Sequence, residues 1–355
     1  MDGCVVFLGG GAVGSYVGAM LALAGTEVVL IDGWPEHVAA IRNSGLRVVA
    51  PEGDLVARPH AWHLMEAYRL RAIEPAAAFI ATKLYDTDWA ARLLANWLAP
   101  AVPVVTMQNA LVEEAVARAL GWGRTLGAVA GGLDVSLSGP GVVQRSRRRC
   151  ATRSPVFKVG ELSGRSTPRA QSLAKLLDKV DGATVTTELW QERWVKLCAN
   201  TMTTGLSGLT GLSLREVYTR EDTRTIAIAL AAEALAVGAA LGFDPPLLFG
   251  LPSPRWHAAA AGDPAARASA MDAMQAQAVA MTDSGMSGTL QDLRKQRPTE
   301  VEFLNGYVAR EGVRAGLTAA THAAVAAMIR EIEQGKRAIG IDAIAEIRSR
   351  AGEAP

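Results

Sequence analysis

A short segment near the N-terminus limits most strongly what this chain can fold into. The apolar run Cys4–Leu8 predicts a buried strand, and Gly9–Gly14 (GGGAVG) follows it at once. A helical pattern comes next, and then a second apolar run, Glu27–Ile31, ends in Asp32. This order of strand, GxGxxG, helix, strand and acid is the fingerprint of a βαβ unit that binds a dinucleotide.

The residue types in the glycine-rich turn have physical reasons. Gly9 permits the tight turn, Gly11 lets the backbone approach a pyrophosphate, and Gly14 lets the helix pack closely on the strand. Ala12 and Val13 open the helix, whose free N–H groups and partial positive charge attract phosphates. We therefore expect these five residues to bind the cofactor.

Asp32 bears on which dinucleotide binds. An acid at the end of the second strand accepts hydrogen bonds from the ribose 2′-hydroxyl and repels a 2′-phosphate. Residues 33–36 contain no arginine, and Arg42 falls on the outer face of the next predicted helix. The sequence therefore favours NAD over NADP. The alternative role, a cap for the helix that begins near Pro35, is compatible with cofactor binding.

The rest of the chain alternates apolar runs with helical segments and then becomes helical. This alternation predicts an α/β fold, with a parallel sheet covered on both faces. We expect a Rossmann domain over 1–186 and a mainly helical domain over 187–355. The predicted strands are 78–82, 102–106 and 125–130, the helices between them are 88–98 and 112–120, and further strands within 142–160 extend the sheet.

Composition excludes several classes of function. A net charge of +1 gives no field that attracts nucleic acid or an anionic membrane. Three scattered cysteines and five histidines show no disulfide framework and no zinc spacing, so we expect a cytoplasmic protein without a metal. The apolar stretch 226–243 is interrupted by Glu233 and predicts a buried helix rather than a membrane span.

Three other segments are predicted from local composition. The basic run 145–149 (RSRRR) indicates a solvated loop or an edge strand. The Pro- and Gly-rich segment 250–263 indicates a loop inside the helical domain, and the tail after Lys336 is expected to fray.

Four blocks of sequence are similar to one known family. They are FLGGGAVGSYVG at 7–18, ATKLYDT at 81–87 with TMQNA at 106–110, RWVKLCANTMTTGLSGLT at 193–210, and TLQDLRKQRPTEVEFLNGYVAREG at 289–312. With these blocks the chain resembles the ketopantoate reductase (2-dehydropantoate 2-reductase) family along nearly its whole length. The resemblance implies a helical domain like that of 6-phosphogluconate dehydrogenase and reduction of a 2-oxo acid to an (R)-2-hydroxy acid.

The candidate catalytic residues are Lys196, Asn200 and Glu300. Hydride addition leaves negative charge on a carbonyl oxygen, so a donor must neutralise it. Lys196 and Asn200 lie four residues apart on a predicted helix and share a face, which pairs an ammonium with an amide donor near the substrate. The resemblance makes Lys196 the general acid and Glu300 the acid that binds the substrate hydroxyl and the nicotinamide ribose. Taken alone, Lys196 would be read as a surface residue and Glu300 as a helix N-terminal acid.

Further positions follow from the resemblance. Asn109 matches an asparagine near the nicotinamide ribose and the substrate, and Lys83 matches a lysine near the adenosine end of the cofactor. Asp292 and Asn305 are expected to be structural.

The substrate shell departs from the family pattern. Thr204 stands where the family has a second asparagine, Leu214 replaces a later asparagine, and Gly288 replaces a serine. We expect Thr204 to line the substrate site and the adjacent Ser287 to substitute for the missing serine.

The leading hypothesis is an NAD-dependent oxidoreductase of a 2-oxo or 2-hydroxy acid or a related carbonyl compound. One alternative is an authentic NADPH-dependent 2-dehydropantoate 2-reductase of pantothenate biosynthesis, and another is a non-catalytic dinucleotide sensor. The expected partner is a small molecule, with no nucleic acid and no membrane, and the sequence leaves a homodimer open.

Overall fold

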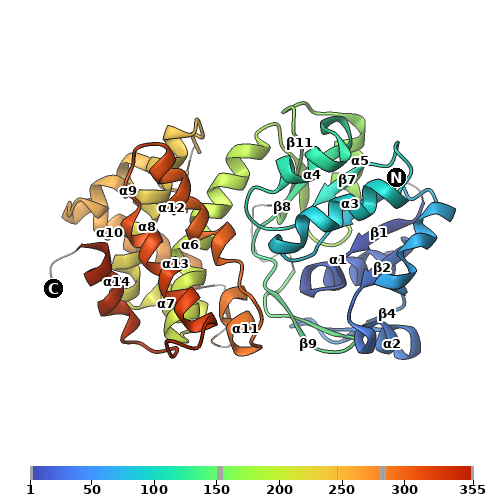
Figure 1. Cartoon of the computed structure of the whole chain (residues 1–355), viewed down its shortest axis with the longest axis horizontal. Coiled ribbons are helices and arrows are strands. Elements are labelled where there is room, and N and C mark those ends of the chain that lie inside the picture. Colours follow the sequence, from blue (N-terminus) through green and yellow to red (C-terminus); the bar gives the residue numbers. More distant parts are fainter. Residues whose placement is uncertain are drawn as a thin grey trace. The chain divides into compact units, whose positions relative to one another are not determined.

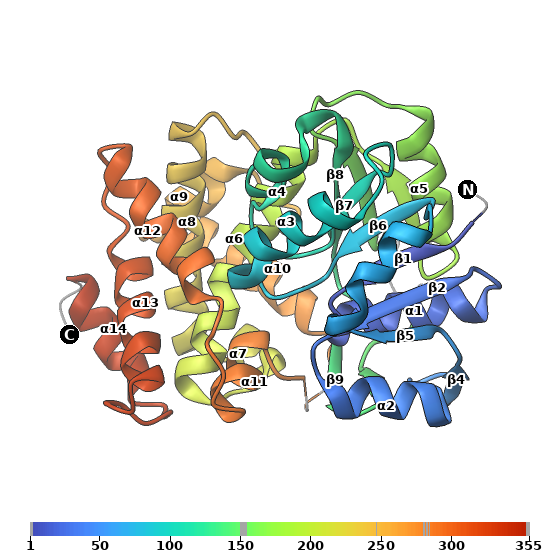
Figure 2. The same ribbon diagram turned by 45° about the vertical axis from the view of Figure 1, so that its right-hand side comes forward.

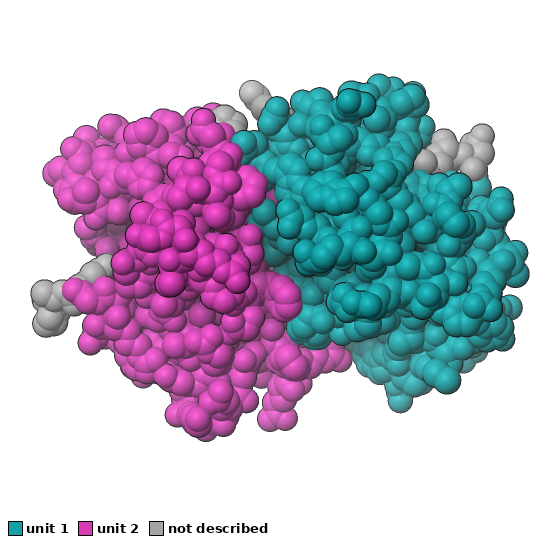
Figure 3. All heavy atoms as spheres, turned by 45° about the horizontal axis from the view of Figure 1, so that its top comes forward, with its two compact units in different colours: residues 1–192 teal, residues 193–355 magenta. Residues whose placement is uncertain are grey.

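The computed structural model describes residues 3–149, 155–245, 247–279, 281, 283 and 285–352 (Figure 1). Cys150 and the segment 151–154, within the predicted strands of 142–160, lie outside these residues. The chain divides into two compact units, Met1–Glu192 and Arg193–Pro355, coloured separately in Figure 3. The unit boundary falls inside one long helix, and the domain boundary expected at residue 186 stays a prediction.

Unit 1 is built on an eight-stranded sheet. Neighbouring strands are parallel except for one antiparallel pair, β8 with β11, near one edge. The Rossmann order predicted from the first βαβ unit is thus present, with two strands added beyond it. In spatial order the strands are β12 (Ala183–Val185), β11 (Phe157–Glu161), β8 (Thr125–Ala130), β7 (Val104–Thr106), β6 (Ala77–Ile80), β1 (Val5–Leu8), β2 (Val28–Asp32) and β5 (His60–His63).

Helices cover both faces of this sheet. Because successive side chains of a strand point to opposite faces, Val5 and Phe7 of β1 belong to one hydrophobic core, and Val6 and Leu8 belong to another. The first core includes α1 (Ala12–Leu23), α2 (Pro35–Ser44) and α5 (Pro168–Asp178), and the second includes α3 (Thr87–Trp97), α4 (Glu113–Leu120) and the 3-10 helix η1 (Leu64–Ala72). In Figures 1 and 2, α3 and α4 lie together over one side of the sheet.

A second, four-stranded sheet departs from the prediction for 142–160. Its order is β4 (Leu55–Ala57), β3 (Leu46–Val49), β10 (Val142–Arg145) and β9 (Val135–Gly139). Only β11 extends the main sheet, whereas β10 pairs in parallel with β3. The pairing joins segments far apart in the chain, and α1 packs on the small sheet.

Arg145 corrects the prediction of a solvated basic run. Its side chain is buried, and Nη2 lies 2.5 Å from Oδ2 of the equally buried Asp181. Nη1 also donates to the Tyr16 hydroxyl at 2.6 Å. A buried guanidinium requires such partners, and they come from remote parts of the chain.

Unit 2 is helical and is arranged around α8 (Glu221–Ala240). This helix has the length and apolarity of a membrane span, yet 61% of its most apolar window is buried inside the protein. It packs against several other helices of the unit, so the predicted buried helix is confirmed. The remaining elements are α6 (Leu189–Thr210), α7 (Leu214–Thr219), α9 (Ser253–Ala260), α10 (Pro264–Ala278), α11 (Gly288–Arg294), the 3-10 helix η4 (Val301–Phe303), α12 (Asn305–Arg314), α13 (Ala320–Glu333) and α14 (Ala343–Ala351).

Two predicted irregular segments are helical instead. The expected loop 250–263 contains α9, because proline is tolerated in the first turn of a helix and the fully buried Trp256 anchors α9 in the core. The tail after Lys336 forms α14, which Arg350 ties to Glu331 at 2.7 Å.

Candidate functional site

The predicted cofactor residues of unit 1 lie along one edge of the main sheet. The segment Gly9–Gly14 follows β1, Asp32 ends β2, Lys83 follows β6 and Asn109 follows β7. These four strands are neighbours and run parallel, so their carboxyl ends meet at the same edge. That edge is where open parallel sheets bind nucleotides.

The glycines after β1 differ in what surrounds them. Gly9 has φ +106°, and a Cβ there would lie 2.6 Å from the Thr82 nitrogen. A Cβ on Gly14 would lie 2.0 Å from the Gly9 oxygen. On Gly11, in contrast, the nearest atom would be the Ala81 oxygen at 3.9 Å. Gly9 and Gly14 are therefore required by packing, whereas the space in front of Gly11 is open, as close approach of a pyrophosphate would require.

The N-terminus of α1 suits an anionic group. The helix begins at Ala12, and its N-cap, Gly11, has no side chain to accept the first N–H groups. The first turn also carries no acidic residue. Uncapped N–H groups together with the helix dipole attract phosphate.

Asp32 is oriented by backbone donors. Its Oδ2 accepts from the Gly10 N–H and its Oδ1 accepts from the Trp34 N–H, both at 2.8 Å. A carboxylate has about four acceptor positions, so lone pairs remain for ribose hydroxyls. Arg42 forms an ion pair with Glu66. Arg42, the basic residue nearest in sequence that could attract a 2′-phosphate, is thus paired with another side chain.

The loop that carries Asn109 is supported by residues that were not predicted from the sequence. Thr106 Oγ1 donates to the fully buried Glu113 at 2.7 Å. Gln108 Nε2 donates to the carbonyl of Lys83 at 3.2 Å, which links the loops after β6 and β7. Their polarity was visible in the TMQNA block, but their partners were not.

In unit 2, α6 presents a partly exposed stripe. Lys196, Asn200 and Thr204 are half-buried and follow one another at intervals of four residues, whereas Leu197 and Thr201 beside them are buried. A spacing of four residues places side chains on one helix face. The shared face predicted for Lys196 and Asn200 is therefore present.

A buried network anchors the segment after Glu300 against α6. Asn305 Nδ2 donates to the carbonyl of Thr201 at 3.0 Å and to Nδ1 of His322 at 3.2 Å. Complete burial lowers the pKa of His322 to about 4, so its ring is neutral and its Nε2 donates to the Leu230 carbonyl. The structural role expected for Asn305 is thereby explained.

The hydroxyls expected to contact substrate are engaged within the protein. Thr204 donates to the Asn200 carbonyl at 2.9 Å. Ser287, 2% exposed, accepts from the Leu290 N–H at 3.0 Å and donates to the Thr204 carbonyl at 3.2 Å. Because a hydroxyl has one hydrogen, neither residue can offer a donor to a substrate in this arrangement. Ser287 is the N-cap of α11, and its substrate role stays a prediction.

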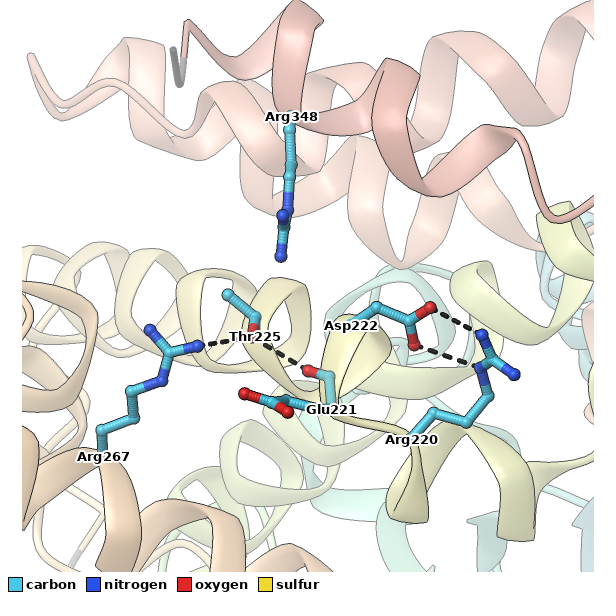
Figure 4. Close-up of a pocket in the computed structure, with 6 residues that line it drawn as sticks. All are labelled: Arg220, Glu221, Asp222, Thr225, Arg267 and Arg348. Carbon is cyan, nitrogen blue, oxygen red and sulfur yellow. Dashed lines mark hydrogen bonds and ion pairs between the residues drawn. The ribbon is translucent and has the colours of Figure 1, made fainter. Parts of the chain in front are cut away.

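A separate pocket of about 640 Å³ lies at the N-terminus of α8 (Figure 4). In it, Arg220 forms an ion pair with Asp222 at 2.7 Å, and Arg267 donates to the Thr225 hydroxyl at 2.9 Å. None of the predicted site residues lines it. The lining residues are Arg220, Glu221, Asp222, Thr225, Arg267 and Arg348.

Comparison with known families identifies the arrangement. The family model "Ketopantoate reductase PanE/ApbA" matches residues 5–155, and the model of the C-terminal part of the same proteins matches residues 188–333. The chain belongs to the ketopantoate reductase family. The resemblance inferred from the four sequence blocks is thus confirmed, and so is the predicted fold of a Rossmann part followed by a helical part.

Similar proteins cover almost the whole chain. A 2-dehydropantoate 2-reductase of Mesorhizobium japonicum is 27% identical over 92% of this chain and 97% of that protein. One of Archaeoglobus fulgidus is 25% identical over 93% and 98%. The crystal structure of a ketopantoate reductase from Ralstonia eutropha has a TM-score of 0.75 at 25% identity and covers 94% of this chain and 99% of its own. D-mandelate dehydrogenase with NADH and anilino(oxo)acetate has the same fold, with a TM-score of 0.74 at 19% identity over 94% and 99%.

The protein is therefore an enzyme, an oxidoreductase that acts on a CH–OH group with a nicotinamide cofactor. The comparisons thus favour the enzyme hypothesis over the alternative of a non-catalytic sensor.

Proposed function

We propose that the protein is an NAD-dependent reductase of a 2-oxo acid, with Lys196 as the proton donor. The observation that carries the proposal is the stripe on α6, where Lys196 and Asn200 share a partly exposed face of the helix. An ammonium beside an amide donor matches the charge that develops on a reduced carbonyl oxygen.

The preference for NAD rests on Asp32. Its carboxylate is fixed by two backbone donors and keeps lone pairs for the ribose hydroxyls, and it would repel a 2′-phosphate. The complex of D-mandelate dehydrogenase with NADH supports this choice for the fold. Ala12 and Val13 would hold the pyrophosphate by their N–H groups, and Lys83 and Asn109 would lie along the rest of the cofactor.

When bound, the reduced cofactor supplies a hydride to the carbonyl carbon of the substrate. Lys196 Nζ gives a proton to the carbonyl oxygen as negative charge develops there, and Asn200 donates a hydrogen bond to the same oxygen. Glu300 accepts from the resulting hydroxyl. The 2-oxo acid thereby becomes a 2-hydroxy acid, and the lysine regains its proton from solvent.

The substrate is proposed to be more apolar than ketopantoate. The hydroxyls of Thr204 and Ser287 donate to backbone carbonyls of the protein, and Leu214 and Gly288 have no polar side chain. Each unmade hydrogen bond in a dry site costs about 1–3 kcal/mol. An aryl or branched 2-oxo acid avoids this cost, and the anilino(oxo)acetate bound to D-mandelate dehydrogenase likewise carries an aryl group beside its oxo and carboxylate groups.

The second candidate function is NADPH-dependent reduction of ketopantoate. It is favoured by the names of the similar proteins from Mesorhizobium and Archaeoglobus. Rates with NADH and NADPH, each measured with ketopantoate and with phenylglyoxylate, separate the two candidates. A clear advantage of NADPH with ketopantoate would establish the second.

The catalytic assignment is tested by Lys196→Ala. We expect kcat to fall by roughly 10²–10⁴, the usual contribution of a positioned proton donor, with little change in cofactor affinity. Lys175→Ala, at an exposed position of α5, is the matched control and should retain full activity. Normal turnover of folded Lys196→Ala would assign the lysine to the surface.

A further inference from the structure

His37, on α2, is a fully buried titratable residue that the proposed chemistry does not use. Its Nδ1 accepts from the Gly141 N–H at 2.9 Å, and its Nε2 lies 3.1 Å from the Ser15 hydroxyl. Trp34 stacks on the ring, with 5.6 Å between the centroids. Both ring nitrogens therefore have a polar partner inside the protein.

The direction of these hydrogen bonds follows from the donors available. The Ser15 hydroxyl donates its one hydrogen to the Gly10 carbonyl at 2.6 Å, so it must accept from His37 Nε2. Because Nδ1 accepts, the ring is neutral. A continuous chain of donors thus runs from Gly141 through His37 and Ser15 to Gly10.

Both backbone polar groups of Gly10 form hydrogen bonds. Its carbonyl accepts from Ser15, and its N–H donates to Asp32 Oδ2 at 2.8 Å. Gly10 lies between Gly9 and Gly11, in the turn expected to meet the cofactor. The chain from His37 therefore ends on the backbone that positions both this turn and the Asp32 carboxylate.

Protonation of His37 would break the chain, because Nδ1 would become a second donor facing the Gly141 N–H. Burial lowers the pKa of His37, whereas Asp32 and the backbone of Gly10 act in the opposite direction. Asp32, at the end of β2, is the one charged group among the described residues that acts on the ring. Helix α1 presents the Ser15 hydroxyl to it, and the turn after β9 presents the backbone of Gly141.

We propose that His37 is a positioning residue for the dinucleotide, which fixes the glycine turn and Asp32 before the cofactor arrives. The proposal rests on the assignment of the cofactor to residues 9–14. A loop that is already ordered loses less entropy on binding, so its affinity is higher. Since His37 touches no reacting atom, it should control cofactor affinity and leave the chemical step unchanged.

The test measures the dissociation constants of NADH and NADPH, together with kcat at saturating cofactor, for the full chain. His37→Phe keeps a ring but loses both hydrogen bonds, and binding should weaken about tenfold. Under the same conditions kcat should stay within about twofold, because saturation removes an affinity effect. His37→Gln retains a donor toward Ser15 and should recover most of the affinity. Ser15→Ala removes the next link and should reproduce the loss.

The pH profile separates positioning from simple packing. Wild-type affinity should stay constant at neutral pH and fall only when the pH drops well below the ordinary histidine pKa of about 6.5, because burial lowers the pKa of His37. His37→Gln should show a smaller change over the same range. His60→Phe, at an exposed position of β5, is the control and should behave as wild type.

Two results would overturn the proposal, and they are distinguishable. If His37→Phe and Ser15→Ala lose thermal stability but bind cofactor normally, His37 only supports the fold. If the wild type binds neither NADH nor NADPH, the assignment of the cofactor itself fails, and the positioning role fails with it.

Discussion

Gly238 shows at the scale of one residue how closely two helices of unit 2 approach. It lies within α8, where no turn requires a glycine, and a Cβ there would lie 2.1 Å from Nε1 of Trp194. Trp194 is fully buried, donates to the Ala234 carbonyl at 3.2 Å and stacks on Phe243. The glycine is thus required by the indole ring.

We predict that Gly238→Ala destabilises the protein by about 1–3 kcal/mol, the usual cost of overpacking a core. Alanine would otherwise stabilise a helix interior by up to about 1 kcal/mol, so the sign of the change is informative. Urea unfolding measures it. The control is Gly288→Ala, because a Cβ at Gly288 meets no atom within 4 Å. An unchanged or raised free energy of unfolding for Gly238→Ala would contradict the packing argument.

His322 predicts a dependence of stability on pH. Burial lowers its pKa to about 4 in the folded protein, whereas an unfolded chain has the ordinary value near 6.5. The stability contributed by the neutral ring is therefore complete above pH 6.5 and is lost progressively as the pH falls toward 4. The loss amounts to about 3 kcal/mol.

Unfolding free energies of wild type and His322→Gln, measured from pH 7 to pH 4, test this prediction. The variant should be less stable at pH 7, because its hydrogen bonds are altered, but should lose less stability on acidification. Equal slopes for the two proteins would rule out His322 as the titrating group. His60→Gln should keep the wild-type slope, since its side chain is exposed.

At the scale of elements, Glu233 connects two helices. It interrupts the apolar face of α8, and its carboxylate accepts from the N–H groups of Thr321 and His322 at 2.9 and 3.1 Å and from the Thr321 hydroxyl at 2.7 Å. The N-cap of α13 is Ala319, which has no capping side chain. A distant glutamate thus caps the helix.

Glu233→Ala should lower the free energy of unfolding by about 1–3 kcal/mol, because buried N–H groups of α13 would lose their acceptor. Glu233→Gln keeps one acceptor oxygen and should be affected less. Thermal unfolding of the two variants measures the difference. Equal stability of Glu233→Ala and wild type would show that water replaces the carboxylate.

The same scale shows which elements can be predicted from sequence. The strands β1, β2 and β6–β8 are buried on both faces, so they appear as apolar runs bounded by turn residues. Strand β4 has three residues, and its Leu55 and Val56 are exposed, so it lacks that signal. The pairing of β3 with β10 was not predicted because the partners are remote in the chain.

At the scale of the whole molecule, the site residues that can be predicted are those that belong to short sequence motifs. The glycine turn and Asp32 follow from spacing, whereas Lys196 and Glu300 required the family resemblance. Glu113 and His37 were missed because their partners come together only in the folded chain. Burial and hydrogen bonding of such residues have no local signature.

Substrate choice depends on residues from several segments of the chain. It can be altered by substituting residues of two segments together. Thr204→Asn with Gly288→Ser restores two of the family's three polar residues, and the open space around Gly288 admits the new side chain. We expect kcat/KM for ketopantoate to rise about tenfold or more, the value of one recovered hydrogen bond of roughly 1.4 kcal/mol. Activity on phenylglyoxylate should not rise in parallel. No gain with ketopantoate would show that other residues set the preference.

The parallel pairing of β3 with β10 also bears on the order in which the protein is made. The glycine turn is synthesised before Gly141, which follows its partner His37 by 104 residues. The entropic cost of closing so long a loop grows slowly with its length, whereas folding slows as contacts become more distant in the chain. A nascent chain that ends before β10 therefore carries the complete dinucleotide motif without the support behind it. Full affinity for the cofactor is thus acquired only after β10 has been synthesised, although the sequence motif is translated earlier.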